Sequence, residues 1–336
     1  MSEAFPMNGG DGAYSYTKNS QYQKLGSDSV KEMIQQAIIE NLDTKISNTV
    51  AIADLGCSVG PNTFFTVENL IKAVQKKHPS KTLEFQVFFS DHSGNDFNTL
   101  FASLPPERHY HAAGVPGSFH GRLFPCSSIS VAHSSYAVQW LSKQPQGAPN
   151  EGRIHCSDAP EAVLKAYSDQ YEKDLGDFVS ARGEEVASGG IVILVFAAAP
   201  DGIPHSEILT SVLYSYFGHC LMELANEGVV EKKKIDEFNL PLYDPREGEV
   251  RRVIERNGCF SVVKMELLYP LETREIEVGS MIVSLRAALE GVFMACFGSS
   301  VVEKLFNKML TKTDEIAKRL ESVHDHAQLF LVLKRK

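Results

Sequence analysis

The sequence predicts an α/β fold: a doubly wound, Rossmann-like sheet that is mostly parallel and covered by helices on both faces. Short apolar runs such as 190–197 alternate along the chain with longer stretches of helical periodicity such as 159–186, and this alternation is typical of βαβ units. A turn with two glycines joins the first apolar run to a helix. More helical sequence is present than such a sheet needs, so we also expect an α-helical cap over the carboxyl edge of the strands, where ligands of open α/β sheets bind.

Strands are expected where short apolar runs lie between turn residues. These runs cover 49–53, 83–89, 129–133, 190–197, 260–267 and 329–334. Glycines and prolines such as Gly114 and Pro116 interrupt 107–128, which is therefore expected to form a loop. Residues 1–24 are rich in Gly, Ser, Asn and Tyr and are expected to be irregular.

Helices are expected where apolar residues recur every three or four positions. In 27–41 this spacing places Val30, Ile34, Ala37 and Ile38 on one face. The other expected helices cover 63–76, 95–103, 159–186, 206–227, 247–256, 280–297 and 301–322.

The chain is expected to form a single unit over 1–336. The core sheet would use about 49–200 together with 258–268 and 328–336. The helical cap would use about 1–48, 201–257 and 269–327.

The composition argues against several classes of partner. A formal net charge of -9 disfavours nucleic acid, whose binding proteins show a basic patch or stripe. The basic run Lys232-Lys233-Lys234 is flanked by acidic residues, and we interpret it as a solvated helix face.

No uninterrupted apolar stretch reaches the ~18 residues of a membrane span, and residues 1–8 lack the pattern of a secretory signal. The six cysteines are scattered without a C-x-x-C pair. We therefore expect a cytoplasmic protein with no membrane and no nucleic-acid partner.

The turn after the first strand, Asp54-Leu55-Gly56-Cys57-Ser58-Val59-Gly60-Pro61-Asn62, is the most informative segment. Gly56 and Gly60 allow a tight turn and a close approach to a ligand, because glycine has no Cβ. Their spacing differs from the G-x-G-x-x-G of dinucleotide-binding turns. The carboxylate of Asp54 suits a ligand with a cationic amino group, such as S-adenosylmethionine, better than a pyrophosphate. The turn therefore favours a methyltransferase over a dehydrogenase.

Four further residues, at three places in the chain, have two interpretations each. Asp91 ends the second strand, where an acid binds ribose hydroxyls, although Asp is also common as a cap of the next turn. Ser118 and Phe119 would bind and stack on an adenine ring, or they belong to an ordinary loop with a buried ring. Trp140 is the only tryptophan and is either a core residue or a ligand contact.

The eleven histidines show no H-x-x-x-H spacing, and no G-x-S-x-G segment is present, so neither a catalytic zinc nor a serine hydrolase is expected.

Further motifs follow one order along nearly the whole chain. They are Met7-Asn8-Gly9-Gly10, Ser15-Tyr16, Asn19-Ser20, Ala53 to Ser58, Gly60-Pro61-Asn62, Asn95 to Asn98, Val115 to Phe119, Gly121 to Pro125, Ser134-Ser135-Tyr136, Trp140-Leu141-Ser142 and Asp236 to Pro241. Together these segments resemble those of the plant SABATH methyltransferases, which methylate carboxylic acids or, in the caffeine branch, purine nitrogens.

The resemblance implies a set of site residues. The expected contacts of S-adenosylmethionine are Tyr16, Ser20, Asp54, Gly56, Cys57, Asn62, Asp91, His92, Ser118 and Phe119. Gln23 and Trp140 match the pair that bonds the substrate carboxylate in acid-methylating members. The expected pocket walls are Tyr136, Gln139, Tyr214, Leu285 and Ala288.

The resemblance also implies a structural Mg²⁺, away from the reacting atoms, and a homodimer. The metal would lie near Asn150, Asp236, Phe238 and Asn239. For Asp236 the alternative is a charged residue at a helix end. Two departures from the family concern the site: His92 replaces a common leucine, and the region 268–280 is short.

The implied reaction is methylation of a small organic acid to its methyl ester. Such an acid is already ionised at neutral pH, so no acid–base residue is expected. The nearest alternative is an N-methyltransferase of the purine branch, in which Gln139-Trp140 also occurs. Two others are an NAD-dependent oxidoreductase, which the glycine spacing disfavours, and a non-catalytic protein that binds a hormone-like acid.

Overall fold

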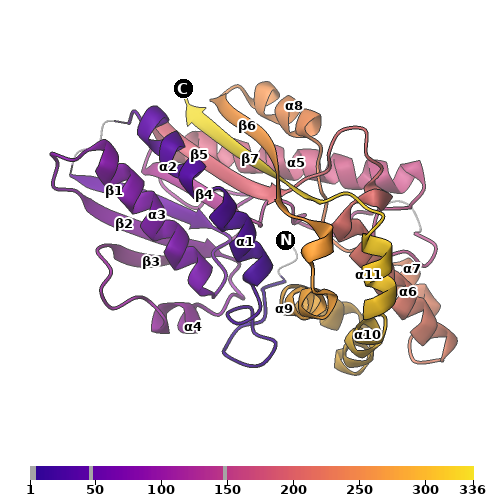
Figure 1. Ribbon diagram of the computed structural model, residues 1–336. Coiled ribbons are helices and arrows are strands. Elements are labelled where there is room, and N and C mark those ends of the chain that lie inside the picture. Colours follow the sequence, from indigo (N-terminus) through magenta and orange to yellow (C-terminus); the bar gives the residue numbers. More distant parts are fainter. Residues whose placement is uncertain (1–4, 45–47, 147–149) are drawn as a thin grey trace.

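The computed structural model describes residues 5–44, 48–146 and 150–336 and shows one twisted sheet flanked by helices (Figure 1). Within these residues the sheet has seven strands in the order β3-β2-β1-β4-β5-β7-β6. The strands are β1 Thr49–Leu55, β2 Glu84–Asp91, β3 His111–Pro116, β4 Ile129–Ser135, β5 Val186–Ala197, β6 Phe260–Leu271 and β7 His326–Arg335. Strands β1 to β5 pair in parallel, and β7 runs antiparallel to β5 and β6. This confirms the predicted doubly wound α/β class.

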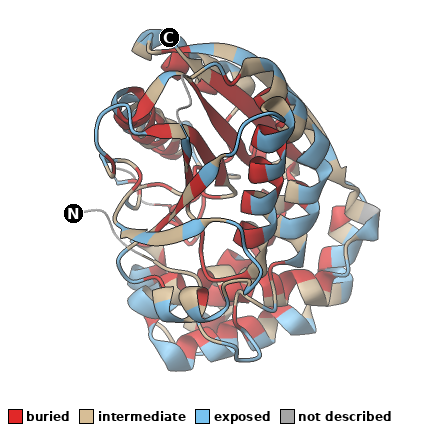
Figure 2. Ribbon diagram, turned by 90° about the vertical axis from the view of Figure 1, so that its left-hand side faces the viewer, coloured by how far each residue is buried: buried red, intermediate tan, exposed pale blue. Residues whose placement is uncertain are grey.

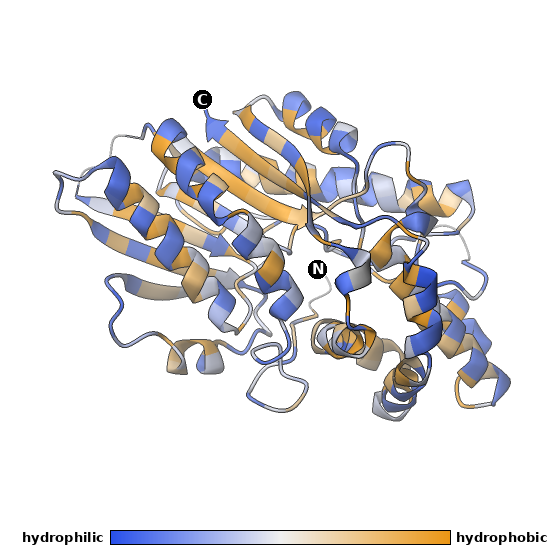
Figure 3. Cartoon of the chain, in the orientation of Figure 1, coloured by the Kyte–Doolittle hydropathy of each residue, from blue (hydrophilic) through white to orange (hydrophobic). Residues whose placement is uncertain are grey.

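Helices cover both faces of the sheet. The helices are α1 Gln21–Ser29, α2 Lys31–Asn41, α3 Pro61–Lys77, α4 Phe97–Ala102, α5 Glu161–Glu185, α6 Leu209–Asn226, α7 Lys232–Asp236, α8 Glu247–Asn257, α9 Val278–Phe297, α10 Ser299–Thr311 and α11 Thr313–Leu320. Helices α2 and α3 pack on one face of the sheet, and α5 and α8 on the other. Figure 2 shows buried strands beneath helices whose outer faces are exposed. Strands β5 and β7 are strongly apolar in Figure 3, because their alternate side chains belong to the cores on the two faces of the sheet.

Helices α6, α7, α9, α10 and α11 share a core of their own, separate from the cores on the two sheet faces. Phe217, Phe293 and Phe306 lie at its centre, with ring centroids 5.2 to 6.1 Å apart. Figure 1 shows this group beside the edge at which the parallel strands end. Helix α9 is long and apolar enough to cross a membrane by length and composition, but 56% of its most apolar window is buried inside the fold. Packing in this core accounts for its hydropathy.

Four expectations about local structure need correction. The range 27–41 forms two helices that meet at Val30, and α1 begins within the supposedly irregular 1–24, of which 1–4 lies outside the described residues. The expected face is nevertheless buried, with Val30 and Ile38 fully inaccessible. The range 301–322 likewise forms two helices, which meet at Lys312. The lysines of α7 are exposed, as predicted.

The fourth correction concerns β3, which lies in a segment expected to be a loop. It is an edge strand that pairs only with β2 among the described strands, and none of its residues is buried. The structure therefore explains why this strand contains a glycine and a proline. A Cβ on Gly114 would lie 3.0 Å from the ring of Phe101, and an edge strand accommodates Pro116 because one side of it needs no ladder donor.

Candidate active site

The turn that follows β1 is tied to the end of β2. Gly56 has a φ of +83°, and a Cβ on it would lie 2.4 Å from the Cβ of Ala137. Its N–H and that of Cys57 donate to the carbonyl of Ser90, at 2.8 and 3.1 Å. Only glycine meets both requirements, the left-handed conformation and the close contact. The predicted turn is therefore a fixed wall at the carboxyl edge of the sheet.

The carboxylate of Asp91 lies directly against this turn. One oxygen accepts the backbone N–H of Ser58 at 2.8 Å, and the other accepts that of His92 at 2.7 Å. Burial raises the pKa of Asp91, and these two donors act in the opposite direction. Burial and the nearby Asp91 together raise the pKa of Tyr16. The carboxylate thus has a fixed orientation and keeps lone pairs for ligand hydroxyls.

Asp54 is held by two side chains that the sequence analysis did not identify. Thr63 at the start of α3 donates its hydroxyl to Oδ2, and His133 Nδ1 lies 2.7 Å from Oδ1. Asp54 and His133 are register partners in the parallel strands β1 and β4. Pairing the ends of these two strands would have revealed the contact. Asp54 is 4% exposed, so its geometry is fixed before any ligand binds.

Two adjoining cavities surround these acids. The Asp91 cavity holds about 620 Å³ of space and is lined by Tyr16, Asp91, His92, Phe119, Trp140 and their neighbours, including the N-terminal Phe5 to Met7. The Asp54 cavity holds about 410 Å³ and is lined by Gln23, Asp54, Cys57, Asn62, His133 and others. Tyr16, Gly56 and Ser58 line both. Most of the expected cofactor residues therefore meet in one place.

A third cavity, the Asp244 cavity, lies between the sheet edge and the cap and holds about 700 Å³. Of the expected substrate residues, Gln23, Tyr136, Gln139, Tyr214 and Leu285 line it. Four polar lining residues were not expected, namely Tyr22, Thr210, Asp244 and His326. Gln23 also lines the Asp54 cavity, and Tyr136 also lines the Asp91 cavity. The three cavities therefore adjoin one another through shared lining residues.

Some expected residues lie behind this surface. The carbonyl and hydroxyl oxygens of Ser20 accept hydrogen bonds from Asn62 Nδ2 at 3.2 and 3.0 Å. Ser118 Oγ accepts the N–H of His120 at 3.4 Å. Ala288 packs against the core of the cap. Ser20 and Ser118 thus support their neighbours, and none of the three lines a cavity.

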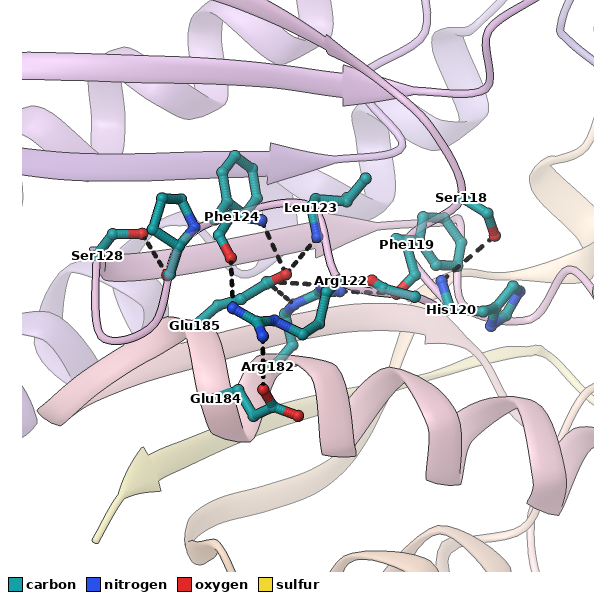
Figure 4. Close-up of polar contacts among 12 residues, drawn as sticks. Ser118, Phe119, His120, Arg122, Leu123, Phe124, Ser128, Arg182, Glu184 and Glu185 are labelled. Carbon is teal, nitrogen blue, oxygen red and sulfur yellow. Dashed lines mark hydrogen bonds and ion pairs between the residues drawn. The ribbon is translucent and has the colours of Figure 1, made fainter.

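A buried ion pair fixes the loop that carries Phe119 (Figure 4). Arg182 is 1% exposed and Glu185 is 0% exposed, and they lie 2.7 Å apart near the end of α5. Arg182 donates to the carbonyls of Phe119 and Gly121 at 2.7 and 2.9 Å. Glu185 accepts the N–H of Phe124 at 3.0 Å. The charges of Arg182 and Glu185 are thus satisfied by each other and by the backbone of the loop. The position of the Phe119 ring therefore depends on this ion pair.

The residues expected near a metal include a hydrogen-bonded pair. Asn150 Nδ2 donates to Asn239 Oδ1 at 2.9 Å and to the carbonyl of His155 at 3.0 Å. Asn150 Oδ1 and Asp236 Oδ1 are both buried without a hydrogen-bond partner. Phe238 lies in the core of the cap. The described residues contain no group of three or more His, Cys, Asp or Glu side chains suited to a metal, so any ion here would depend on the carboxylate of Asp236 together with amide and backbone oxygens.

The doubly wound sheet, the glycine turn after β1 and the acids that end β1 and β2 define the nucleotide-type site of an S-adenosylmethionine-dependent methyltransferase. The chain belongs to the SABATH family, because the model for "SAM dependent carboxyl methyltransferase" matches residues 2–336. S-adenosylmethionine is therefore the methyl donor, and the oxidoreductase and non-catalytic alternatives are removed.

Relatives cover the full length of the chain. Loganic acid O-methyltransferase from Catharanthus roseus is 40% identical over 353 residues, covering 99% of this chain and 95% of the relative. Paraxanthine methyltransferase 2 from Arabidopsis thaliana is 37% identical over 344 residues, covering 98% of each. A solved structure, "Loganic acid methyltransferase with SAH", has a TM-score of 0.95 at 39% identity, covering 98% of this chain and 99% of that one. Family and fold are thus shown, whereas the substrate is not.

Replacing Arg182 by Met is expected to lower the free energy of unfolding by about 3–5 kcal/mol, because Glu185 would remain as a buried, uncompensated charge. Urea unfolding followed by circular dichroism measures this change. The neighbouring pair Arg122–Glu184 is a matched control, since its side chains are 45% and 55% exposed. Arg122→Met should cost less than about 1 kcal/mol. Equal losses in the two variants would contradict a special role for the buried pair.

Asp244 predicts a pH dependence of stability. Burial raises its pKa from an ordinary 3.8 to about 6, so the folded state favours the protonated carboxyl and loses stability as the pH rises from about 4 to about 6. Asp244→Asn removes this loss. The variant should therefore gain stability relative to the wild type across that window, by roughly 3 kcal/mol in total, and the difference should stay constant above it. Urea unfolding across the window tests this, and a difference independent of pH would refute it.

Proposed function

We propose that the enzyme transfers the methyl group of S-adenosylmethionine to the carboxylate of a small organic acid, which becomes a methyl ester. The observation that carries the proposal is the set of neutral N–H donors that line these adjoining cavities: Gln23 lines the Asp54 and Asp244 cavities, and Trp140 lines the Asp91 cavity. The described lining residues of all three cavities include no lysine and no arginine. The family assignment supports a carboxyl acceptor, and one relative is named for loganic acid.

Gln23 and Trp140 are the proposed donors to the substrate carboxylate. The hydroxyl of Ser284 lies 3.5 Å from Gln23 Oε1, which leaves the amide nitrogen for a ligand. Trp140 lines the Asp91 cavity, and Gln23 lines the other two. The indole N–H and the amide N–H are donors without a formal charge. They would therefore orient the carboxylate without a competing cation that reduces its nucleophilicity.

The proposed mechanism is an in-line displacement at the methyl carbon. The acid is already ionised at neutral pH, so the protein needs no general base. Its contribution is orientation: it holds a carboxylate oxygen about 3 Å from the methyl carbon and in line with the sulfur. The negative carboxylate and the positive sulfonium neutralise each other as the ester forms, and an enclosed cavity favours the loss of charge.

Methylation of a purine nitrogen is the second candidate, because a paraxanthine methyltransferase is 37% identical to this chain. A purine would need polar groups that match the edges of its ring. Gln139 and Asp244 are polar lining residues, but they do not decide between the two candidates. Turnover decides: labelled S-adenosylmethionine is incubated with a panel of carboxylic acids and with xanthines, and acids should be the better substrates.

Trp140→Phe keeps most of the ring and deletes the indole N–H, so it should cost roughly 1–3 kcal/mol in kcat/KM for acids. Gln23→Leu should cost a similar amount. The double variant should lose less than the sum, because both donors bind one group. Methyl-transfer kinetics measure these losses, and calorimetry should show that cofactor affinity barely changes.

Gln170→Leu is the matched control, since it makes the same substitution outside the three cavities, where Gln170 Nε2 donates to Asp174. It should leave kcat/KM for acids nearly unchanged. If Trp140→Phe has no effect on acid methylation, or if xanthines are better substrates than any acid, the carboxyl proposal is wrong and the purine candidate replaces it.

The proposal includes a structural Mg²⁺ near Asn150, Asp236, Phe238 and Asn239. The buried, unpartnered oxygens of Asn150 and Asp236 support it, because Mg²⁺ prefers oxygen ligands. Elemental analysis of the purified protein should find magnesium, and a chelator should lower the melting temperature until magnesium is restored. A protein without metal whose melting temperature ignores the chelator would exclude the ion. Homodimerisation and a cytoplasmic location remain predictions from the sequence.

A further inference from the structure

Asp244 is a buried carboxylate for which the described residues provide no cationic partner. It is 3% exposed, and the hydroxyl of Thr210 donates to its Oδ2. No ion pair and no second side-chain donor contacts it in the described part of the chain. Buried charges in proteins are normally paired. Oδ1 is therefore an acceptor that is left for a ligand.

The position of Asp244 separates it from the reacting end of the site. Of the three cavities, Asp244 lines only the one named after it, whereas Gln23 and Tyr136 also line the cofactor cavities. A substrate whose carboxylate lies at the shared border would extend its remaining part into the space lined by Asp244. The residue is thus placed to contact what distinguishes one acid from another.

The carboxylate is held in place by its surroundings. The backbone N–H of Tyr243, the preceding residue, donates to the carbonyl of Gln139 at 3.0 Å. His205 Nε2 lies 3.3 Å from the carbonyl of Asp244. Thr210 is in the first turn of α6, where the helix dipole favours a negative charge. The acceptor is therefore fixed in orientation before a ligand binds.

Other polar lining groups also lack partners. Gln139 Oε1 and His326 Nδ1 have no hydrogen bond within the described residues. Burial lowers the pKa of His326 to about 4, so it is neutral at pH 7 and supplies no cation. A pure hydrocarbon chain would leave Asp244 desolvated and unpaired, which weakens binding. A second carboxylate on the substrate would be repelled.

We propose that Asp244 is a specificity-determining residue, whose carboxylate binds a hydrogen-bond donor, a hydroxyl or an ammonium group, on the part of the substrate beyond the methylated carboxylate. The inference rests on the proposed function and adds the class of acid: hydroxy or amino acids, in preference to hydrocarbon acids and diacids. The methyl transfer itself is unchanged, because Asp244 contacts neither the methyl group nor its acceptor oxygen.

The test uses matched sets of acids with labelled S-adenosylmethionine. Each set has one carbon skeleton, such as hexanoic, octanoic, decanoic or cinnamic acid, that carries hydrogen, a hydroxyl or an aminomethyl group at its far end. The wild type should prefer a hydroxy or amino member over the hydrocarbon member by roughly 10- to 100-fold in kcat/KM. Asp244→Leu should abolish the preference. The isosteric Asp244→Asn should keep part of a hydroxyl preference and lose an ammonium preference.

Asp174→Asn is the control, since Asp174 is also a buried acid, at 2% exposure, but lines none of the three cavities. It should leave the ratio within each set unchanged. The inference is overturned if the wild type does not discriminate within any set, or if Asp244→Leu and Asp244→Asn discriminate as the wild type does. If the wild type methylates xanthines and no acid, the proposed function itself fails. The two failures are therefore distinguishable.

Discussion

The backbone turn after β1 is the constraint on which the ligand site depends. Because Gly56 is in a left-handed conformation against Ala137, no larger residue fits without moving the segment that follows β4. The same turn bonds to the end of β2 through Ser90 and, by the N–H of Ser58, to Asp91. Three strand ends are thus coupled through one short peptide, and this peptide lines both cofactor cavities. A change in the register of these strands would therefore also change the geometry of the cofactor site.

The two halves of the site come from different layers of the molecule, and this division allows the substrate side to vary. The cofactor side consists mainly of strand ends and their turns, whereas cap residues on α6 and α9 complete the Asp244 cavity. The N-terminal segment closes the site, because Phe5 to Met7 line the Asp91 cavity and Asn8 Nδ2 donates to Glu290 on α9 at 2.5 Å. The cap has its own core, so a change in its lining residues does not disturb the sheet.

Most of the fold was predictable from the sequence, because the buried strands and amphipathic helices follow one dominant period each. The edge strand β3 was missed because its packing depends on Phe101 and β2, which local sequence does not report. On the cofactor side, the strand–turn–helix pattern and the strand ends located Asp54 and Asp91, but not His133, whose role appears only when β1 and β4 are paired in register. Asp244 escaped notice because a single acid outside any motif has no sequence signature. Only the fold shows that it lines a cavity.

Electrostatics link this acid to the chemistry of the site. A carboxylate substrate brings a negative charge into the space between the sheet edge and the cap, and the sulfonium of the cofactor would compensate that charge only at the reacting end. Asp244 adds a second negative group, and Thr210 alone gives it a side-chain hydrogen bond among the described residues. In a low-dielectric cavity such an acceptor has a high cost when unpaired and a strong attraction for a donor. A hydrocarbon acid would leave that cost in place, whereas a hydroxyl or ammonium group removes it. The same charge that makes the empty cavity unfavourable thus selects the ligand that fills it.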